Sequence, residues 1–259
     1  MKIAVCVKQV PDTWAEKTLQ AGDSTLDREG PEGVMNEIDE YAVEEALQLV
    51  EAHGGDVTVV TMGPVKAAET VRKALSMGAE AGIHLIDDGL HGSDALATSY
   101  ALAEILKDRG FDLVLFGSES TDARMSVVPA MVAERLGWAQ ATFAQKVEIS
   151  GDSVVTHRVS ETGFDTVEAT LPAVISVVEK INEPRYPSFK GIMAAKKKPV
   201  ETLSIADAGL DASKLGLSAA WSTVADFAAR PPKAAGTVVT DAGDGGVKIA
   251  DYLSEHKFI

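Results

Sequence analysis

The sequence predicts an α/β protein built around a mostly parallel sheet. Four short apolar runs alternate with four helical segments between Lys2 and Leu136, which is the pattern of successive βαβ units. The runs end close to Gly, Pro or Asp, residues that stop strands and form turns. Hydrophobic residues make up 46 % of the 259-residue chain, which is enough for a buried core.

The four apolar runs are short and rich in β-branched and aliphatic residues, as buried parallel strands are. They are Lys2–Val7, Asp56–Met62, Ala81–Ile86 and Leu113–Phe116. The predicted helices run from Asn36 or Asp39 to Glu51, over Val65–Met77, from Ser93 or Asp94 to Asp108, and over Val127–Leu136. The pair Glu44–Glu45 in the first helix is expected on its solvated face.

The carboxyl ends of these strands should meet at one edge of the sheet. Right-handed crossovers place all four following loops there, and ligands of open α/β sheets bind at that edge. A ligand beside Gly117 is therefore expected to reach the Cys6–Val10 loop and Met62 as well.

The stretch Asp112–Pro129 is the best candidate for a binding site. Its apolar strand ends at Gly117, and small or hydrogen-bonding residues follow before the next helix. This order presents free backbone N–H groups to an anion at a helix N-terminus. Two interpretations stay open, a phosphate-bearing ligand or an ordinary βα turn capped by Ser and Asp, because no glycine-rich phosphate-binding motif is present.

Two regions depart from the alternating pattern. Residues 13–34 are polar, charged and rich in Gly, which predicts a long exposed excursion that contains a short hairpin and has a function. After Trp138, β-rich segments with turn residues between them predict hairpin strands that extend or cover the sheet edge. These strands are Ala141–Ile149, Ser153–Val159, Phe164–Thr170 and Ala173–Val178, and His157 within them is expected to be a surface residue.

Charge and cysteine content exclude several classes of protein. The net charge of −15 and the pI of about 4.7 argue against nucleic acid or an anionic membrane as the main partner. The single cysteine, Cys6, excludes an intrachain disulfide and a cysteine-based metal cluster, and no metal site is predicted. A lone cysteine and the absence of a leader before the first strand are typical of a cytoplasmic protein.

Residues 181–200 contrast with the acidic remainder of the chain. Pro184 and Pro187 bracket Arg185-Tyr186, and Phe189 follows in what we expect to be an irregular exposed loop. Between Arg185 and Val200 every charged residue is basic (Arg185, Lys190, Lys196, Lys197 and Lys198). The segment is either a solvated linker or a docking element with an apolar anchor beside positive charge.

The remaining residues, 201–259, are rich in Ala and do not carry enough apolar residues for a core of their own. Ser218–Ala229 and Val247–Lys257 are at most short helices. Such an arm is expected to lie on another surface.

Several stretches make the sequence recognisable: KIAVCVKQVPD, MNEIDEYAVEEALQL, DLVLFGSESTDARMSVVPAMVAERLGW and NEPRYPSFKGIMAAKKK. Over almost the whole chain they resemble the small (beta) subunit of the electron-transferring flavoproteins. The resemblance implies a Rossmann-like (adenine nucleotide alpha hydrolase-like) fold with a β-hairpin extension and an extended C-terminal arm. It divides the chain into a nucleotide-binding domain over 1–180, a partner-recognition loop over 181–200, and an arm over 201–259 that wraps the large subunit.

The resemblance also implies an electron carrier, with no catalytic residues of its own. The family's members are heterodimers, with FAD mainly on the large subunit and AMP as a structural ligand in the small one. Electrons would come from acyl-CoA dehydrogenases and similar flavin dehydrogenases of fatty acid β-oxidation and pass to a membrane quinone oxidoreductase. We expect a protein of the bacterial cytoplasm that neither inserts into membranes nor binds nucleic acid.

Two sets of residues carry over from the family. The implied cofactor-binding residues are Cys6, Asn36, Glu37, Ile38, Asp39, Met62, Gly117, Ser120, Thr121, Asp122, Arg124, Ser126 and Val128. The implied partner-docking residues are Tyr186, Phe189, Ile192, Met193, Lys196, Lys197 and Lys198. The topology of the predicted sheet leads independently to the positions after Cys6, Met62 and Gly117, but not to the segment Asn36–Asp39.

This chain departs from the family's pattern at two places. Phe189 stands where the family has Leu, which keeps an apolar anchor but changes its shape. Residues 122–128 lack the family's acidic and amide side chains, and Arg124 there faces either a phosphate or solvent. A branch of the family that oxidises NADH and bifurcates electrons holds a second FAD in the same cleft, and this branch is the alternative function.

Two other classes of function agree less well with the sequence, a nucleotide hydrolase and a signalling module. A nucleotide hydrolase or pyrophosphatase of similar topology needs a phosphate-gripping turn after the first strand, which Val7–Asp12 does not resemble. A stand-alone nucleotide-binding signalling module does not explain the basic loop around Phe189 or the coreless arm.

Overall fold

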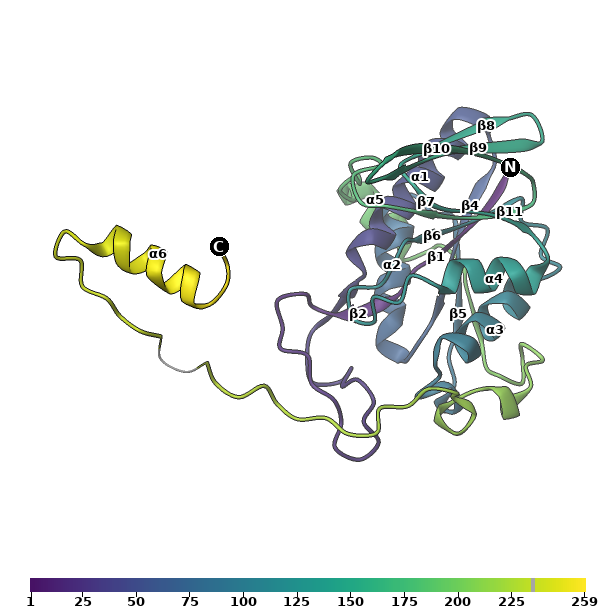
Figure 1. The fold of residues 1–259 in the computed structure, drawn as a ribbon. Helices are drawn as coiled ribbons and strands as arrows, with labels where there is room; N and C mark the ends of the chain where they lie inside the picture. Colours follow the sequence, from purple (N-terminus) through teal and green to yellow (C-terminus); the bar gives the residue numbers. More distant parts are fainter. Residues whose placement is uncertain (234–235) are drawn as a thin grey trace. The chain divides into compact units, whose positions relative to one another are not determined.

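A computed structural model describes residues 1–233 and 236–259 of the chain (Figure 1). It forms two compact units, Met1–Ala225 and Asp226–Ile259. At the centre of the first unit, seven strands form one sheet in the order β12-β5-β4-β1-β6-β11-β7. Their bounds are β1 Lys2–Cys6, β4 Asp56–Met62, β5 Ala81–Leu85, β6 Leu113–Gly117, β7 Ala139–Ala144, β11 Ala173–Val177 and β12 Val200–Leu203.

Every pair of neighbours in this sheet is parallel, and β1 lies between β4 and β6, with Ile3 opposite both Val57 and Leu113. Strands of a parallel sheet are apolar on both faces because helices cover both faces. Accordingly Ile3 and Val5 belong to one core cluster, and Ala4 and Cys6 to the other. The predicted α/β class with a mostly parallel, Rossmann-like sheet is confirmed.

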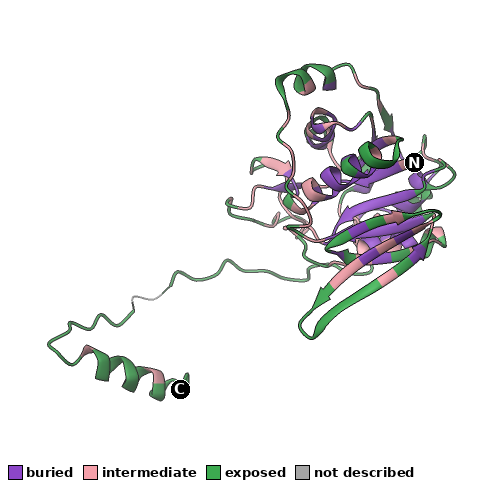
Figure 2. Ribbon diagram, turned by 90° about the horizontal axis from the view of Figure 1, so that it is seen from above, coloured by how far each residue is buried: buried purple, intermediate pink, exposed green. Residues whose placement is uncertain are grey.

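Helices cover both core clusters. Helices α1 (Glu37–His53) and α2 (Ala68–Met77) pack in the first cluster, while α3 (Ala95–Leu106) and α4 (Val128–Leu136) pack in the second. The sheet appears as a continuous buried layer in Figure 2. Asp94 caps α3 as predicted, accepting a hydrogen bond from the Ala97 N–H at 3.0 Å.

The β-rich region differs in part from its prediction. The predicted strand Ala141–Ile149 is two strands, β7 in the main sheet and β8 (Lys146–Ser150) in a separate three-stranded sheet with β9 (Ser153–Ser160) and β10 (Gly163–Thr170). Phe143 has a φ of +61°, which marks the change of direction between β7 and β8. The hairpin of β9 and β10 is confirmed, whereas β11 joins the main sheet between β6 and the edge strand β7.

The predicted excursion after the first strand has a hairpin stem. Strands β2 (Gln9–Pro11) and β3 (Gly33–Met35) pair antiparallel at its base, and Leu19 and Leu26 form an isolated bridge further out.

Residues 200–217 belong to the first unit, so the predicted start of the arm at 201 lies inside it. Strand β12 adds to the sheet edge beside β5, and Leu203, Ile205, Leu210 and Leu215 join the second core cluster. Ser218–Ala229 was expected to form at most a short helix. Only the 3-10 turn Leu217–Ala219 forms there, because the next residues are exposed and the N–H groups of Trp221 and Ser222 donate to Asp94 rather than to a preceding helical turn.

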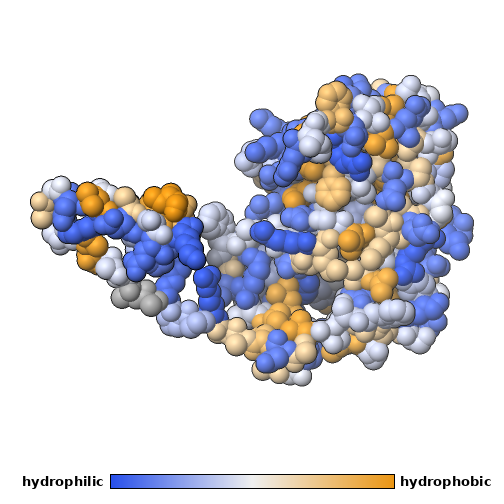
Figure 3. All heavy atoms as spheres, viewed as in Figure 1, coloured by the Kyte–Doolittle hydropathy of each residue, from blue (hydrophilic) through white to orange (hydrophobic). Residues whose placement is uncertain are grey.

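Among its described residues, the second unit forms the helix α6 (Gly245–Glu255), close to the predicted Val247–Lys257. The apolar side chains of this helix are exposed, Val247 by 64 % and Ile249 by 62 %. Figure 3 shows orange, hydrophobic residues on the surface of this unit. Within the described residues, no helix is long and apolar enough to cross a membrane.

The packing of residues 200–217 gives a stability prediction. Replacing Leu215, which is 2 % exposed, by Ala should lower the free energy of unfolding by roughly 2–5 kcal/mol, because it removes buried methyl groups and leaves a cavity. Val238→Ala, at a position 93 % exposed, is the control and should change it by less than about 0.5 kcal/mol. Urea unfolding followed by circular dichroism measures both, and equal effects would contradict this packing.

Candidate functional site

The carboxyl edge of the sheet is held together by one buried carboxylate. Asp39, in the first turn of α1, accepts hydrogen bonds from the Lys8 N–H at 2.8 Å and from the Gly117 N–H at 3.2 Å. These two residues stand at the ends of β1 and β6, so the carboxylate joins both strands to the helix. A side chain at Gly117 would collide with Asp39, so this close approach requires glycine there.

Asn36 connects the same edge to the loop after β6. It stands at the N-cap of α1, but its side chain does not cap the helix. Instead its Nδ2 donates to the Glu119 carbonyl at 2.9 Å, and its Oδ1 accepts from the Thr121 N–H at 3.0 Å. The structure therefore brings Asn36 and Asp39 beside the 117–122 loop, a juxtaposition that the strand order alone did not predict.

A cluster of charges lies on the Asp122 carboxylate. Lys8 Nζ lies 2.8 Å from Oδ1, and Arg28 Nη2, from the excursion, lies 3.0 Å from Oδ2. Lys8 Nζ also lies 3.2 Å from the Ser120 hydroxyl oxygen. The Asp122 side chain is only 1 % exposed, whereas Lys8 and Arg28 are each about one-third exposed. Taken by itself, this cluster of two cations and one carboxylate carries a charge of +1, and both cations are partly exposed.

Sequence reasoning named neither Lys8 nor Arg28 as a site residue. Lys8 directly follows the first strand and lies in the loop that the topology argument had placed at this edge, so its charge was a usable signal. Arg28 gave no signal, because 94 residues separate it from Asp122 and only folding brings the excursion to this edge of the sheet.

The loop after β6 has an unusual backbone. Arg124 and Ser126 both have positive φ, +49° and +57°, and the Arg124 N–H donates to the Ser120 carbonyl at 2.8 Å. The Ser126 hydroxyl donates to Glu119 at 2.9 Å, while Arg124 is exposed. The Thr121 hydroxyl oxygen is buried and has no hydrogen-bond partner among the described residues. An unpaired buried hydroxyl costs free energy, so it suits a bound polar ligand.

The other predicted cofactor residues form the walls and rim of this edge. Cys6 is buried in β1, Met62 ends β4, and Val128 begins α4 beside the second core cluster. Glu37 is exposed and accepts a hydrogen bond from the Thr13 hydroxyl, and Ile38 is half-buried next to it.

Burial shifts the pKa values of the groups at this edge. Burial raises the pKa of Asp39 to about 7, against hydrogen bonds from Asn36, Lys8 N–H and Gly117 N–H that favour the charged form. For Asp122 the opposite holds: burial alone would raise its pKa, but the charge and hydrogen bond of Lys8, together with Arg28, hold it below the usual range. Burial, followed by the negative charge of Asp39, raises the pKa of the Cys6 thiol, which therefore stays protonated at neutral pH.

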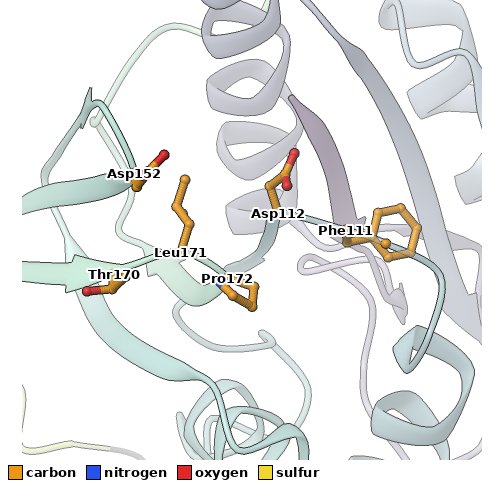
Figure 4. A pocket seen from close by; sticks show the side chains of 7 residues that line it. Phe111, Asp112, Asp152, Thr170, Leu171 and Pro172 are labelled. Atoms are coloured by element: carbon orange, nitrogen blue, oxygen red, sulfur yellow. The ribbon is translucent and has the colours of Figure 1, made fainter.

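A pocket lies at the opposite, amino edge of the sheet (Figure 4). Its lining includes Asp112, Asp152, Phe111 and Pro172. The lining carries two carboxylates and no basic side chain, so it does not suit a phosphate. Within the described residues, no group of three or more His, Cys, Asp or Glu side chains could hold a metal ion.

The predicted docking segment is more ordered than an irregular loop. Residues Phe189–Ala195 form the helix α5, which Ser188 caps by accepting from the Gly191 N–H at 3.0 Å. Tyr186 is 96 % exposed and Phe189 81 %, and Ile192 and Met193 are about half exposed.

The three lysines after α5 do not share one environment. Lys196 and Lys197 are both exposed, whereas Lys198 Nζ donates to the carbonyls of Leu75, Gly78 and Ala79 at the end of α2. Lys198 thus acts as a helix C-cap in the structure, and its charge is directed inward.

Comparison with known proteins agrees with the sequence motifs. The family model for the electron transfer flavoprotein domain matches residues 23–208. The chain belongs to the electron transfer flavoprotein family. The beta subunit from Mycobacterium tuberculosis is 53 % identical over 99 % of both chains, and the one from Megasphaera elsdenii is 36 % identical over 98 % of this chain and 97 % of its own. The predicted family is confirmed.

One relative is named after a larger complex and not as an electron transfer flavoprotein subunit beta. Subunit CarD of the caffeyl-CoA reductase-Etf complex from Acetobacterium woodii is 36 % identical over 93 % of this chain and 92 % of its own. The matches support the role of an electron transfer flavoprotein beta subunit, which works with a partner subunit.

The raised pKa of Asp39 gives a prediction on pH. The folded state binds a proton on Asp39 between pH 4 and 7 that the unfolded state does not, so the free energy of unfolding should fall as pH rises through this window. Relative to an Asp39→Asn variant, the wild-type chain should lose about 2 kcal/mol between pH 5 and pH 7 and nothing further above pH 8. Urea unfolding at pH 5, 6, 7 and 8 measures this, and parallel curves for the two proteins would contradict it.

Proposed function

We propose that this chain is the beta subunit of a heterodimeric electron shuttle, with AMP as a structural ligand in the cleft at the carboxyl edge. The FAD that carries the electrons would lie mainly on the large subunit. Electrons would arrive from flavin dehydrogenases of the acyl-CoA dehydrogenase type in fatty acid β-oxidation. They would leave to a membrane quinone oxidoreductase, from a carrier in the bacterial cytoplasm.

The observation that carries the nucleotide proposal is the charge at the cleft. Within the cluster of Lys8, Arg28 and Asp122 there are two cations for one carboxylate, and both cations are partly exposed. A phosphate bears negative charge and accepts hydrogen bonds, so it complements this edge. The buried Thr121 hydroxyl offers one more polar contact to a ligand. Arg124 at the exposed bend of the loop would face the phosphate from outside.

The residues present also fit a subunit that leaves the redox chemistry to a bound flavin. When bound, FAD accepts and donates the electrons, and the protein supplies binding and position. The thiol of Cys6 is buried and protonated, and Asp39 is bonded to backbone N–H groups, so both have structural roles at this edge. We therefore propose that no side chain of this subunit is a catalytic residue.

The docking proposal concerns the surface of residues 186–197. Tyr186, Phe189, Ile192 and Met193 project apolar surface from one short segment, and Lys196 and Lys197 stand beside it. Such a patch fits an apolar pocket with an acidic rim on a partner dehydrogenase. The exposed apolar residues of the second unit, among them Val247, Ile249 and Tyr252, are proposed to lie on the large subunit.

A second candidate function has one observation in its favour. The relative CarD belongs to a caffeyl-CoA reductase-Etf complex, which is consistent with a bifurcating, NADH-oxidising role. In that case the same cleft would hold a second FAD in place of AMP.

The nucleotide released from the denatured, co-expressed heterodimer tests the proposal. One FAD and one AMP per heterodimer would support the simple shuttle, and two FAD would support the bifurcating carrier. A heterodimer that releases no adenine nucleotide besides its one FAD would overturn the proposed role of the cleft.

Phe189 gives a prediction on docking. Phe189→Ala in the heterodimer should raise the apparent KM for reduction by a purified acyl-CoA dehydrogenase by about thirtyfold, because it removes the central apolar anchor. Phe164→Ala, at a hairpin position 71 % exposed, is the matched control and should leave this KM unchanged. Flavin content should be the same in both variants.

A further inference from the structure

The segment before α5 is fastened to helix α1 by Arg185. Its Nε and Nη2 lie 2.8 Å and 3.0 Å from the two carboxylate oxygens of Glu44. Its Nη1 and Nη2 lie 2.5 Å and 3.1 Å from those of Glu51, two turns further along the same helix. The Arg185 N–H also donates to Glu44, at 3.1 Å. One guanidinium thus binds two carboxylates in the bidentate geometry that only arginine provides.

This contact explains a sequence expectation that was wrong. Glu44 and Glu45 were expected on a solvated helix face, but they are 3 % and 7 % exposed. Asn182 Nδ2 donates to Glu45 and to the Tyr41 carbonyl, and Arg185 covers Glu44. Burial alone would raise the pKa of Glu44, but the hydrogen bonds from Arg185 outweigh it and hold the pKa below its usual range.

The other end of the segment is fastened to helix α2. A Cβ at Gly191 would collide with the Ser76 carbonyl oxygen, so α5 packs against α2 at backbone distance (Figure 1). Lys198 closes the C-terminus of α2 through three carbonyl oxygens, and Arg72 donates to the Ala195 carbonyl. Residues 182–198 are therefore held at their start, middle and end.

The side chains on this fixed backbone divide into two groups. Ala195 faces the first core cluster and is 3 % exposed, whereas Tyr186 and Phe189 are almost fully exposed. If these large apolar side chains stood on a mobile loop, the loop would lose conformational entropy when a partner bound. That loss would weaken the association. A backbone already held in place avoids most of that loss.

We propose that Arg185 is a positioning residue for partner docking, which holds Tyr186 and Phe189 in place by fastening their segment to Glu44 and Glu51. This inference rests on the proposed docking function and names the residues that make the surface effective. The Arg185 guanidinium is turned toward α1, where it binds Glu44 and Glu51, and about one third of the side chain stays exposed.

The test uses the co-expressed heterodimer with Arg185→Gln, which keeps some hydrogen bonding but removes the charge and the bidentate contact. We expect the apparent KM for reduction by the dehydrogenase to rise about tenfold with kcat unchanged within about twofold, since docking and not electron transfer is affected. Hydrogen–deuterium exchange of the amides of residues 186–195 should become at least about tenfold faster. Arg185→Lys should give an intermediate effect in both measurements.

Glu51→Gln is the second variant, chosen because Glu51 is 58 % exposed and its loss should not prevent folding. It should give a smaller rise in KM and in exchange, in the same direction. Glu134→Gln on the exposed face of α4 serves as a matched control and should change neither.

The outcomes separate this inference from the proposed function. If Phe189→Ala raises KM but Arg185→Gln changes neither KM nor amide exchange, the positioning role is overturned while the docking surface stands. If Arg185→Gln speeds exchange and Phe189→Ala has no effect on KM, the segment is held as described but is not the docking surface. Raised KM and faster exchange together in the Arg185 variants support the inference.

Discussion

The carboxylate of Asp39 is the contact on which the carboxyl edge of this domain depends. Two central strands end beside each other there, and each end presents one N–H group, that of Lys8 or that of Gly117, to the Asp39 carboxylate. Asp39 accepts from both at once and anchors them to the first turn of α1. Because the carboxyl group is buried, its charged form has a higher free energy than it would have in water, and its pKa rises to about 7. A Cβ at Gly117 would prevent this contact, so the glycine and the aspartate form one structural unit.

Helix α1 carries both surfaces that the proposed function needs. Its first turn shapes the cleft through Asn36 and Asp39, and its later turns hold Arg185 through Glu44 and Glu51. A buried arginine–carboxylate pair adds little net stability over an apolar contact, but its geometry is specific. Such a pair is suited to fixing where a segment lies, and this is what a docking surface with exposed aromatic side chains requires.

Much of the fold followed from local patterns. The first four parallel strands and their helices were predicted, because a run of Val, Ile and Leu that ends at Gly or Pro can be identified as a strand from the local sequence alone. The division of residues 139–150 between two sheets was not predicted, since it depends on which strand lies alongside. Strand β12 was missed for a similar reason: Val200–Leu203 is short and mixed in character, and only its pairing with β5 makes it a strand.

The sequence by itself determined the fold class and, through its motifs, the family. It also predicts the edge of the sheet where we propose that a ligand binds. The tertiary structure alone decided which charges meet there. Arg28 reaches Asp122 from an excursion, and Arg185 covers a pair of glutamates that any helical pattern would assign to solvent. The reason is physical: burial of apolar residues repeats with the local period of strand or helix, whereas an ion pair joins residues about a hundred positions apart and leaves no periodic trace.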